Sequence, residues 1–341
     1  MLQTIPVEQA VGMVLPHDVT VIIKDVKKGT AFRKGHIIKT SDIAVLKSLG
    51  KDNIYVLSLT DKDIHENEAA VILAKSLSGK GVIFSSEAIE GKIALHAEFD
   101  GLLRVNKEGL LAFNMLGEVM CSTLHNFTPV KKGENIAATR LIPLIAARSL
   151  VETAASLAES SGAIISVHPL ERKKIGLVIT GNEVFYERIE DRFEEVLREK
   201  AVEYGAEIGL VRKAPDDRDI IAHEISECIA MGCDLIITSG GMSVDPDDVT
   251  REGIIAAGAK TSVYGTPVLP GAMFLSGMIG DVPVLGLPAC GMYHKITVFD
   301  LVMPRILTGE SIGRKELAEL GHGGLCRNCK VCQYPVCNFG K

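Results

Sequence analysis

The hydrophobic pattern of residues 171–309 alternates short apolar runs with amphipathic stretches. The apolar runs within 174–180, 235–237 and 282–287 each end in a turn rich in glycine or proline. Apolar, β-branched runs of this kind are typical of central parallel strands. Between and after them, hydrophobic residues recur at helical spacing: Phe193, Leu197, Ala201 and Tyr204; Ile221, Ile225 and Ile229, with Asp219 placed as a cap; and Met292, Ile296, Phe299, Met303 and Ile306. The alternation predicts an α/β fold, a parallel sheet with helices on both faces.

Residues 1–165 carry a mixed pattern. Ser41 is placed to cap a helix that ends at Gly50, and residues 66–77 and 141–159 have helical spacing. Residues 92–143 are typical mainly of strands, interrupted by glycine turns. We therefore expect an N-terminal mixed α+β region with a β-rich module.

The composition is that of a multi-domain protein without a basic field. Of the 341 residues, 47% are hydrophobic, which is enough for a sizeable core. The net charge of −6 is unfavourable for binding nucleic acid. No apolar run reaches the ~18 residues that span a bilayer, so we expect a cytoplasmic protein that does not engage membranes. The predicted organisation is an N-terminal region at 1–165, the α/β domain at 171–309 and a cysteine-rich tail at 310–341.

The most informative turn follows the apolar run at 235–237. It contains a glycine pair, flanked by hydroxyl side chains and followed by an acidic cluster. Glycines bring backbone N–H groups close to a phosphate, and hydroxyls donate hydrogen bonds. The candidate binding residues here are Thr238, Ser239, Gly240, Gly241, Met242, Ser243 and Asp245. An ordinary strand-to-helix turn is the alternative.

Two further turns are predicted to share one crevice with it. One holds Thr180, Gly181 and Asn182, and the other groups Pro270 and Gly271 with the turn at Pro288. Ligands of open parallel sheets bind outside the carboxyl ends of the strands. These turns therefore predict one pocket for an anion or nucleotide.

Carboxylates near these turns are candidates for a magnesium or oxyanion platform, because hard cations prefer oxygen ligands. The candidates for catalysis are Glu183, Asp191, Asp234, Asp247 and Asp248, with Asp245 beside them. Asp247 and Asp248 have an alternative role, since acidic residues also stabilise the first turn of a following helix.

The chain resembles the molybdopterin-binding domain of molybdenum cofactor biosynthesis proteins in three segments: Thr-Gly-Asn-Glu-Val at 180–184, Asp-Leu-Ile-Ile-Thr-Ser-Gly-Gly-Met-Ser-Val at 234–244 and Gly-Leu-Pro-Ala-Cys at 286–290. The branch it resembles is the molybdopterin molybdotransferases, and the resemblance covers roughly residues 171–309. Segments 32–50 and 54–56 also look like the part that precedes the pterin domain in those enzymes.

The resemblance implies a function in molybdenum cofactor biosynthesis. It implies a magnesium-dependent transferase that binds adenylated molybdopterin and inserts molybdate or tungstate with loss of AMP. Glu183 matches the family's Glu, and Asp191 lies where related domains carry an acidic residue. The resemblance also implies a homo-oligomer and a molybdo- or tungsto-enzyme as a possible partner.

Three positions depart from the family pattern. Asn182 replaces an aspartate, Ala272-Met273 stand where the transferases carry a lysine, and Ala289-Cys290 replace Gly-Asn. The loss of a lysine removes a charge that holds phosphates. A non-catalytic carrier or sensor of molybdopterin is therefore the alternative function, and a hydrolase of nucleotide pyrophosphates is a third.

The tail holds four of the eight cysteines, in the spacing C-x2-C-x2-C-x4-C: Cys326, Cys329, Cys332 and Cys337. In a cytoplasmic protein such density favours metal ligation over disulfides. The spacing is close to the bacterial iron–sulfur run, although four thiolates also suit zinc. The spacing favours an iron–sulfur cluster slightly over zinc, and a redox-active tail without a metal is the third alternative. The usual molybdotransferases end in a small β domain in place of this tail.

Overall fold

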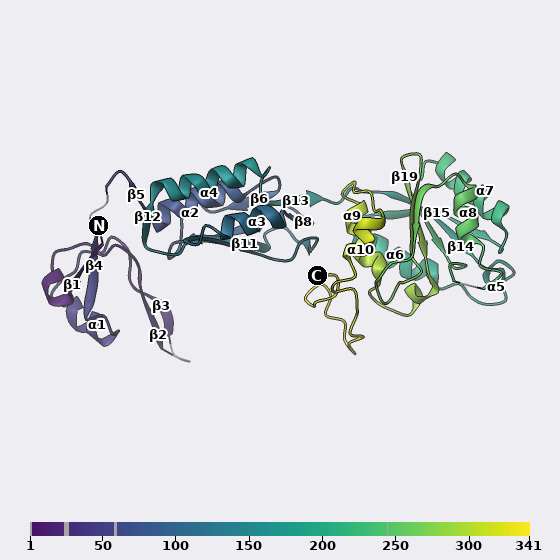
Figure 1. Cartoon of the computed structure of the whole chain (residues 1–341). Coiled ribbons are helices and arrows are strands. Elements are labelled where there is room, and N and C mark those ends of the chain that lie inside the picture. The colour runs from purple at the N-terminus through teal and green to yellow at the C-terminus, as the bar shows by residue number, and fades with distance from the viewer. Residues whose placement is uncertain (1, 24–26, 58–59, 244) are drawn as a thin grey trace. The chain divides into compact units, whose positions relative to one another are not determined.

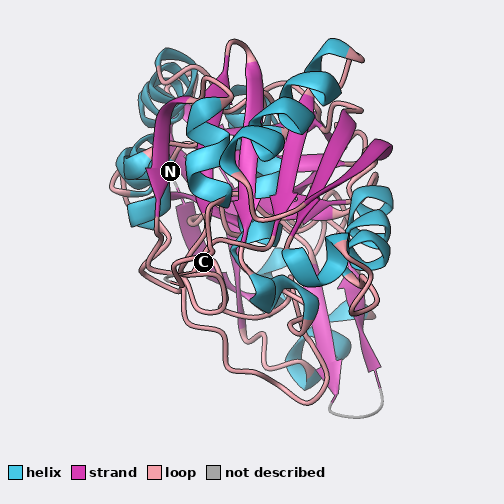
Figure 2. Cartoon of the chain, turned by 90° about the vertical axis from the view of Figure 1, so that its right-hand side faces the viewer, coloured by secondary structure: helices cyan, strands magenta, loops and turns pink. Residues whose placement is uncertain are grey.

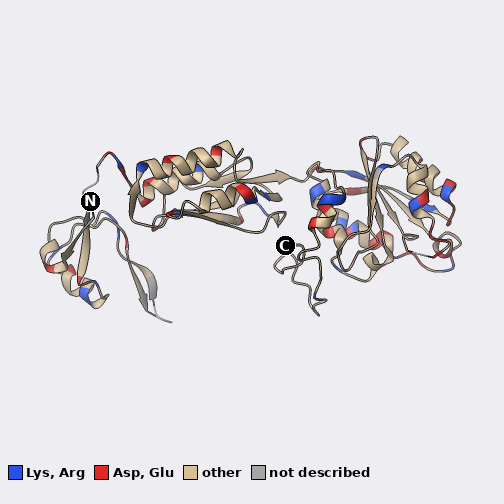
Figure 3. Cartoon of the chain, viewed as in Figure 1, with Lys and Arg blue, Asp and Glu red and all other residues tan. Residues whose placement is uncertain are grey.

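The computed structural model describes residues 2–23, 27–57, 60–243 and 245–341, and Figure 1 shows the elements named below. The chain forms two compact units. The first takes residues 1–98, 105–124 and 132–167, and the second takes 99–104, 125–131 and 168–341. In the described part of the chain, no helix is both long and apolar enough to cross a membrane. Figure 3 shows acidic and basic residues together on the helices of both units.

The N-terminal part of the first unit pairs β1 (Leu2–Pro6) with β4 (Asn53–Leu57) and β2 (Val19–Ile23) with β3 (Lys27–Phe32), both antiparallel. A 3-10 turn, η1 (Val7–Ala10), and helix α1 (Asp42–Ser48) complete it. Leu15, Ile38 and Leu46 are buried in its small core. Ser41 precedes α1 as predicted, but its side chain makes no capping hydrogen bond.

The remainder of the first unit is a four-stranded antiparallel sheet with three helices. The strand order is β6 (Val82–Phe84), β7 (Lys92–Ala97), β11 (Asn135–Leu141) and β9 (Val119–Thr123). The helices are α2 (Glu66–Leu77), α3 (Lys107–Asn114) and α4 (Arg148–Ser160). Strand β5 (Asp63–His65) pairs with β12 (Ile145–Ala147). Outside this unit's four-stranded sheet, strands β10 (Pro129–Val130), β8 (Gly101–Val105) and β13 (Ile165–Pro169) form a three-stranded sheet, of which β10 and most of β8 belong to the second unit.

Two predictions for this region need correction. Residues 92–143 include helix α3, which begins after Asn106, whose side-chain oxygen accepts the Gly109 N–H. The long helix begins at Arg148 and not at Leu141. Leu141 instead ends β11, which is held between β7 and β9 by hydrogen bonds on both sides.

The second unit is built on a six-stranded sheet in the order β15–β14–β16–β19–β18–β17. The strands are β14 (Lys174–Thr180), β15 (Glu207–Ala214), β16 (Leu235–Ser239), β17 (Lys260–Tyr264), β18 (Leu275–Ile279) and β19 (Val282–Leu287). The first four in the sheet order are parallel, and β18 and β17 add an antiparallel edge. Because Ile179 pairs with Ser239 and Ser239 with Leu287, three strands end at one edge.

Helices cover both faces of this sheet (Figure 1 and Figure 2). They are α5 (Asn182–Phe185), α6 (Phe193–Glu203), α7 (Arg218–Ala230), α8 (Thr250–Ala256), η2 (Ala289–Met292), α9 (Val298–Ile306) and α10 (Arg314–Glu319). Leu177 packs in the cluster that holds α6 and α9, whereas its neighbour Val178 packs with α7 and α8. The predicted α/β fold, with a mostly parallel sheet and helices on both faces, is confirmed.

Two details of these helices differ from the prediction. Helix α7 begins two residues earlier than predicted, at Arg218, and Asp217 caps it in place of Asp219, because the Asp217 carboxylate accepts the N–H groups of Asp219 and Ile220. The last apolar stripe is not one helix: Met292 lies in η2, and α9 begins only at Val298. A capping box formed by Thr297 and Asp300 fixes that start.

A buried ion pair joins α6 to α9. The Lys200 ammonium donates to Asp300 Oδ1 (2.5 Å) and to the Lys295 carbonyl (2.8 Å). Asp300 is fully buried and Lys200 is 8% exposed. Tyr204 donates to the same carboxylate oxygen (3.2 Å), and burial together with the Asp300 charge raises the Tyr204 pKa. The second Asp300 oxygen accepts the Thr297 N–H (2.7 Å).

Replacing Asp300 by alanine is expected to destabilise the protein by about 3–5 kcal/mol, because it leaves the Lys200 ammonium buried without its partner. Urea denaturation of the full chain measures this loss. The double variant Lys200→Met/Asp300→Leu should regain part of it, since no unpaired charge remains. Glu199→Ala, on the exposed side of α6, is the control, and a loss as small as that of the control would contradict the role of the pair.

Candidate functional site

A cavity of about 560 Å³ lies where the strand-end turns meet. Twelve of the residues that the sequence analysis nominated line it: Thr180, Glu183, Asp191, Gly240, Gly241, Met242, Ser243, Asp245, Asp248, Pro270, Gly271 and Pro288. They come from the turns after β14, β16 and β19 and from the turn before β18. The structure therefore brings these segments together around one space.

The glycine loop after β16 is held by its neighbours on the sheet. Gly240 has a φ of +90°, and a Cβ there would lie 2.5 Å from the Thr180 carbonyl oxygen, so the loop passes closely over the end of β14. Met242 is buried and packs on Gly286, where a Cβ would lie 2.7 Å from the Met242 Cε. The Tyr264 hydroxyl donates to the Met242 carbonyl (2.7 Å). Met242 is thus an anchor of the loop.

Several hydroxyls nominated as ligand donors are engaged within the fold. Thr180 Oγ1 donates to the Ser239 carbonyl (2.9 Å) and lies 2.7 Å from Thr250 Oγ1, which ties β14 to β16 and α8. Thr238 is buried and donates to the Leu285 carbonyl (3.3 Å). Ser239 is also buried, and its hydroxyl has no hydrogen-bond partner among the described residues. Ser243 is exposed and lines the cavity.

The Pro270–Gly271 turn packs on the start of α9. Gly271 has a φ of +124°, and a Cβ there would lie 2.5 Å from Val298 Cγ1. The Val298 N–H donates to the Pro270 carbonyl (3.2 Å). This wall of the cavity therefore depends on the position of α9, and through α9 on the buried Lys200–Asp300 pair.

The cavity is acidic. Five carboxylates line it, from Glu183, Glu190, Asp191, Asp245 and Asp248, and the described residues that line it include no Lys, Arg or His. Two of the five are partly engaged. Asp191 accepts the N–H groups of Phe193 and Glu194 at the start of α6 (2.9 and 3.2 Å), and Asp248 accepts the Asp245 N–H (3.2 Å).

Other nominated residues lie outside the cavity wall. Asp234 precedes β16 at the opposite edge of the sheet, where it accepts the Lys174 N–H (2.7 Å), so its position does not support a place in the site. Gly181, Asn182, Thr238, Ser239 and Asp247 belong to the same turns but do not line the cavity. Val244, within the resembling segment, lies outside the described residues.

Asp216 is a residue that the sequence analysis missed. The Asn182 N–H donates to Asp216 Oδ2 (2.8 Å), and the Asp216 N–H donates to Asn182 Oδ1 (3.3 Å). Burial raises the pKa of the Asp216 carboxyl against the lowering effect of the Asn182 hydrogen bond, and the charges of Glu183, Asp248 and Asp247 raise it further. Its position, two residues after the end of β15, was the one feature of the sequence that could have indicated a place near the strand-end turns.

The apolar wall was also missed. It includes Ile179, Val184, Phe193 and Met292. Phe193 and Met292 were assigned to helix packing, and Phe193 does belong to the core cluster as well as to the cavity wall. A residue in the first turn of a helix can pack in the core and also line a cavity. The helical spacing of hydrophobic residues indicates only the first of these roles.

Two family models match the chain. Residues 176–308 match the model described as a probable molybdopterin binding domain. Residues 4–58 match a model described as a domain of unknown function. The matched molybdopterin-binding segment contains the glycine loop, the strand-end turns and every residue of the cavity wall.

Curated relatives match a smaller part. The CinA-like protein of Mycolicibacterium vanbaalenii is 35% identical over 79 residues, 23% of this chain and 19% of that protein. The CinA-like protein of Fervidobacterium nodosum is 38% identical over 82 residues, 24% of this chain and 20% of that protein. The match thus spans about a fifth of the length of these relatives.

Solved structures were also found. The molybdopterin biosynthesis enzyme MoaB of Thermus thermophilus is 21% identical, with a TM-score of 0.35, and covers 41% of this chain and 98% of its own. The tungsten cofactor synthesizing protein MoaB of Pyrococcus furiosus is 18% identical, with a TM-score of 0.32. The match covers 40% of this chain and 96% of that protein.

Asp216→Asn is expected to raise the melting temperature at neutral pH. The raised pKa means that the ionised carboxylate is disfavoured in the fold, so its destabilising effect is present above the folded pKa and disappears as the pH falls through it. Asparagine keeps an oxygen acceptor for the Asn182 N–H without the charge. Thermal unfolding at several pH values measures this, and the gain should vanish at acidic pH. A variant less stable than the native chain at neutral pH would contradict the assignment.

Proposed function

We propose that the second unit binds molybdopterin in the cavity and acts in molybdenum or tungsten cofactor biosynthesis. The observation that carries the proposal is the meeting of the strand-end turns around one cavity, inside the segment that matches a molybdopterin-binding family model. A volume of about 560 Å³ lies within the range of roughly 300–1,000 Å³ typical of small-molecule sites.

The two sides of the cavity suit the two ends of such a ligand. Ile179, Val184, Phe193 and Met292 offer apolar surface to a planar ring system. The loop of Gly240 to Ser243 offers close backbone approach and a hydroxyl to a phosphate. The pterin would therefore lie on the apolar side, and its phosphate would lie by the loop.

The acidic wall requires a counter-charge for this ligand. Among the described residues, no group of three or more His, Cys, Asp or Glu side chains is placed to hold a metal ion by itself. Magnesium is usually held by one or two carboxylates together with substrate phosphates. The wall fits magnesium in that form, with Glu183, Asp245 or Asp248 as the protein ligands. When bound, the ion would neutralise charge on the phosphate oxygens.

We propose that the reaction is insertion of molybdate or tungstate into adenylated molybdopterin with release of AMP. Glu183 and Asp248 lie on the wall beside the glycine loop, so they would position the phosphoanhydride. Apolar residues on the other side would limit access of water to the reacting bond.

The second candidate is a carrier or sensor that binds molybdopterin without turnover. It is favoured by the absence of Lys, Arg and His among the described residues lining the cavity, because a positive side chain stabilises charge that develops during phosphoryl transfer. The two candidates make opposite predictions for AMP release.

The full chain, purified without oxygen and given adenylated molybdopterin, magnesium and molybdate, is expected to release AMP. Glu183→Ala and Asp247→Ala/Asp248→Ala should reduce the rate by roughly 10²-fold or more, as removal of a group that stabilises the transition state does. The measurement is chromatographic quantification of AMP over time, with and without magnesium.

Glu252→Ala is the matched control, an exposed acidic residue of α8 that does not line the cavity. Binding of molybdopterin without AMP release would support the carrier or sensor. AMP release that is independent of molybdate would indicate hydrolysis. Absence of binding in any condition would overturn the proposed function.

Ala272→Lys is expected to tighten binding of adenylated molybdopterin and to weaken its dependence on magnesium. Ala272 is exposed on the cavity wall, and a hydrogen bond to a charged group contributes about 1.5–3 kcal/mol, which corresponds to roughly tenfold or more in affinity. Isothermal titration at several magnesium concentrations measures both effects. Ala272→Gln has similar length without the charge, so equal gains in both variants would argue against a phosphate at this position.

A further inference from the structure

The last part of the cysteine-rich tail, residues 325–341, is a folded loop packed on the rest of the second unit. The Cys326 N–H donates to the Leu269 carbonyl (2.8 Å), and the Leu269 N–H donates to the Gly324 carbonyl (2.8 Å). At the other end the Gly340 N–H donates to the Gly323 carbonyl (3.0 Å), which closes the loop. Phe339 is buried in the main hydrophobic cluster. The cysteines therefore have defined positions.

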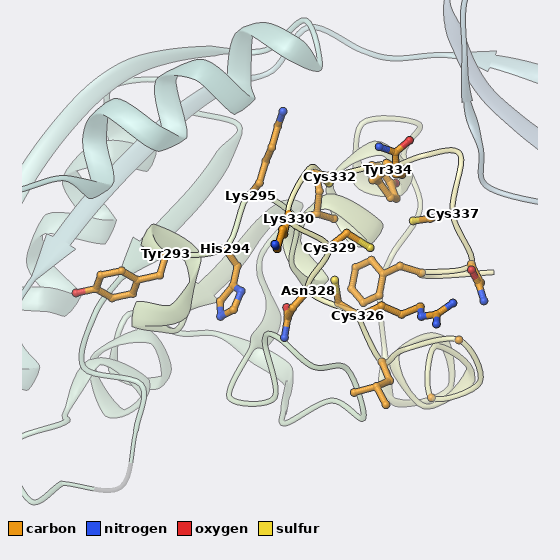
Figure 4. A pocket seen from close by; sticks show the side chains of 18 residues that line it. Tyr293, His294, Lys295, Cys326, Asn328, Cys329, Lys330, Cys332, Tyr334 and Cys337 are labelled. Atoms are coloured by element: carbon orange, nitrogen blue, oxygen red, sulfur yellow. The ribbon is translucent and has the colours of Figure 1, made fainter.

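All four tail cysteines line a second cavity, of about 450 Å³. Figure 4 shows Cys326, Cys329, Cys332 and Cys337 around it, with Tyr334 from the tail and with Tyr293, His294 and Lys295 from the segment before α9. The other four cysteines of the chain do not line this cavity.

The charge around this cavity is opposite to that of the first. His294, Lys295, Arg327 and Lys330 line it, and the described lining residues include no Asp or Glu. Neighbouring positive charges favour thiolates over thiols. The wall therefore suits an anionic centre held by several thiolates.

We propose that Cys326, Cys329, Cys332 and Cys337 bind an iron–sulfur cluster in this cavity. Each thiol would lose its proton to solvent and form one bond to iron, and two ferrous ions, two ferric ions and four sulfides would supply a [4Fe–4S] cluster with no further oxidant. The spacing C-x2-C-x2-C-x4-C differs by one residue from a common cluster-binding run.

The geometry favours a cluster over a single ion. A tetrahedral zinc site needs four sulfurs at about 2.3 Å from one point, whereas a cluster places each thiolate on a different iron, around a larger body. The tail cysteines line a cavity of about 450 Å³, and among the described residues no group of three or more His, Cys, Asp or Glu side chains is placed to hold a single metal ion.

The cluster would lie behind the wall of the first cavity. Ala289, Cys290 and Met292 line the first cavity, and the next residues, Tyr293 to Ile296, line the second. Leu269 also lines the first cavity while its backbone pairs with the tail. The two sites thus share two segments of backbone.

The test is reconstitution of the full chain with a mixture of ferrous and ferric iron and with sulfide, in the absence of oxygen. We expect about four irons and four sulfides per chain, as for a [4Fe–4S] cluster, one of the two cluster types that four cysteines hold. We also expect a broad visible absorption that dithionite bleaches and an electron paramagnetic resonance signal of the reduced cluster. Cys329→Ser and Cys332→Ser should each lower the iron content severalfold and change the signal. Cys121→Ala, in the first unit, is the control and should retain both.

Zinc bound in place of iron after reconstitution would overturn the proposal, as would the absence of labile sulfide from the native chain. Iron and sulfide contents that are unchanged in both serine variants would overturn it too. Circular dichroism of each variant shows whether the fold is kept, and the readouts on the native chain need no variant. None of them depends on pterin binding, so this test and that of the proposed function fail separately.

Discussion

The buried contact between Lys200 and Asp300 is the interaction that connects the elements around both cavities of the second unit. It joins α6 to α9, and the same Asp300 carboxylate accepts the Thr297 N–H and so fixes where α9 begins. The start of α9 supports Gly271 in the first cavity, and the Asp300 carbonyl accepts the Tyr334 hydroxyl of the tail (3.4 Å). Burying this ion pair costs desolvation free energy, and the pair connects α6, α9 and the cysteine-rich tail.

The two cavities of this unit have opposite charge, and this contrast sets what each can bind. The first has five carboxylates and no described basic lining residue, so an anionic ligand gains there only with a cation that accompanies it. The second has four basic residues and four thiols, and it attracts negative charge directly. A net charge of −6 for the whole chain does not reveal this local separation.

The fold of the second unit could be predicted because burial on both faces leaves a strong pattern. Leu177 and Val178 point to different cores, yet both must be apolar. The convergence of the turns followed from parallel strand order. Asp234 was nominated although it precedes its strand, and a carboxylate at that position meets Lys174 at the other edge. Asp216 was missed because its partner, Asn182, is distant in sequence and contacts it only after β15 pairs with β14.

Met242 shows a different limit of sequence analysis. Its place beside two glycines suggested a ligand contact, whereas the structure uses its side chain to fill the space over Gly286. The glycine in β19 and the methionine in the loop are complementary in volume, a relation between segments far apart along the chain that no local spacing encodes. The same reasoning applies to the tail: only the folded chain shows that its cysteines surround one cavity. Ala289, Cys290 and Met292 line the first cavity and residues 293–296 line the second, so one continuous segment of backbone contributes to both walls.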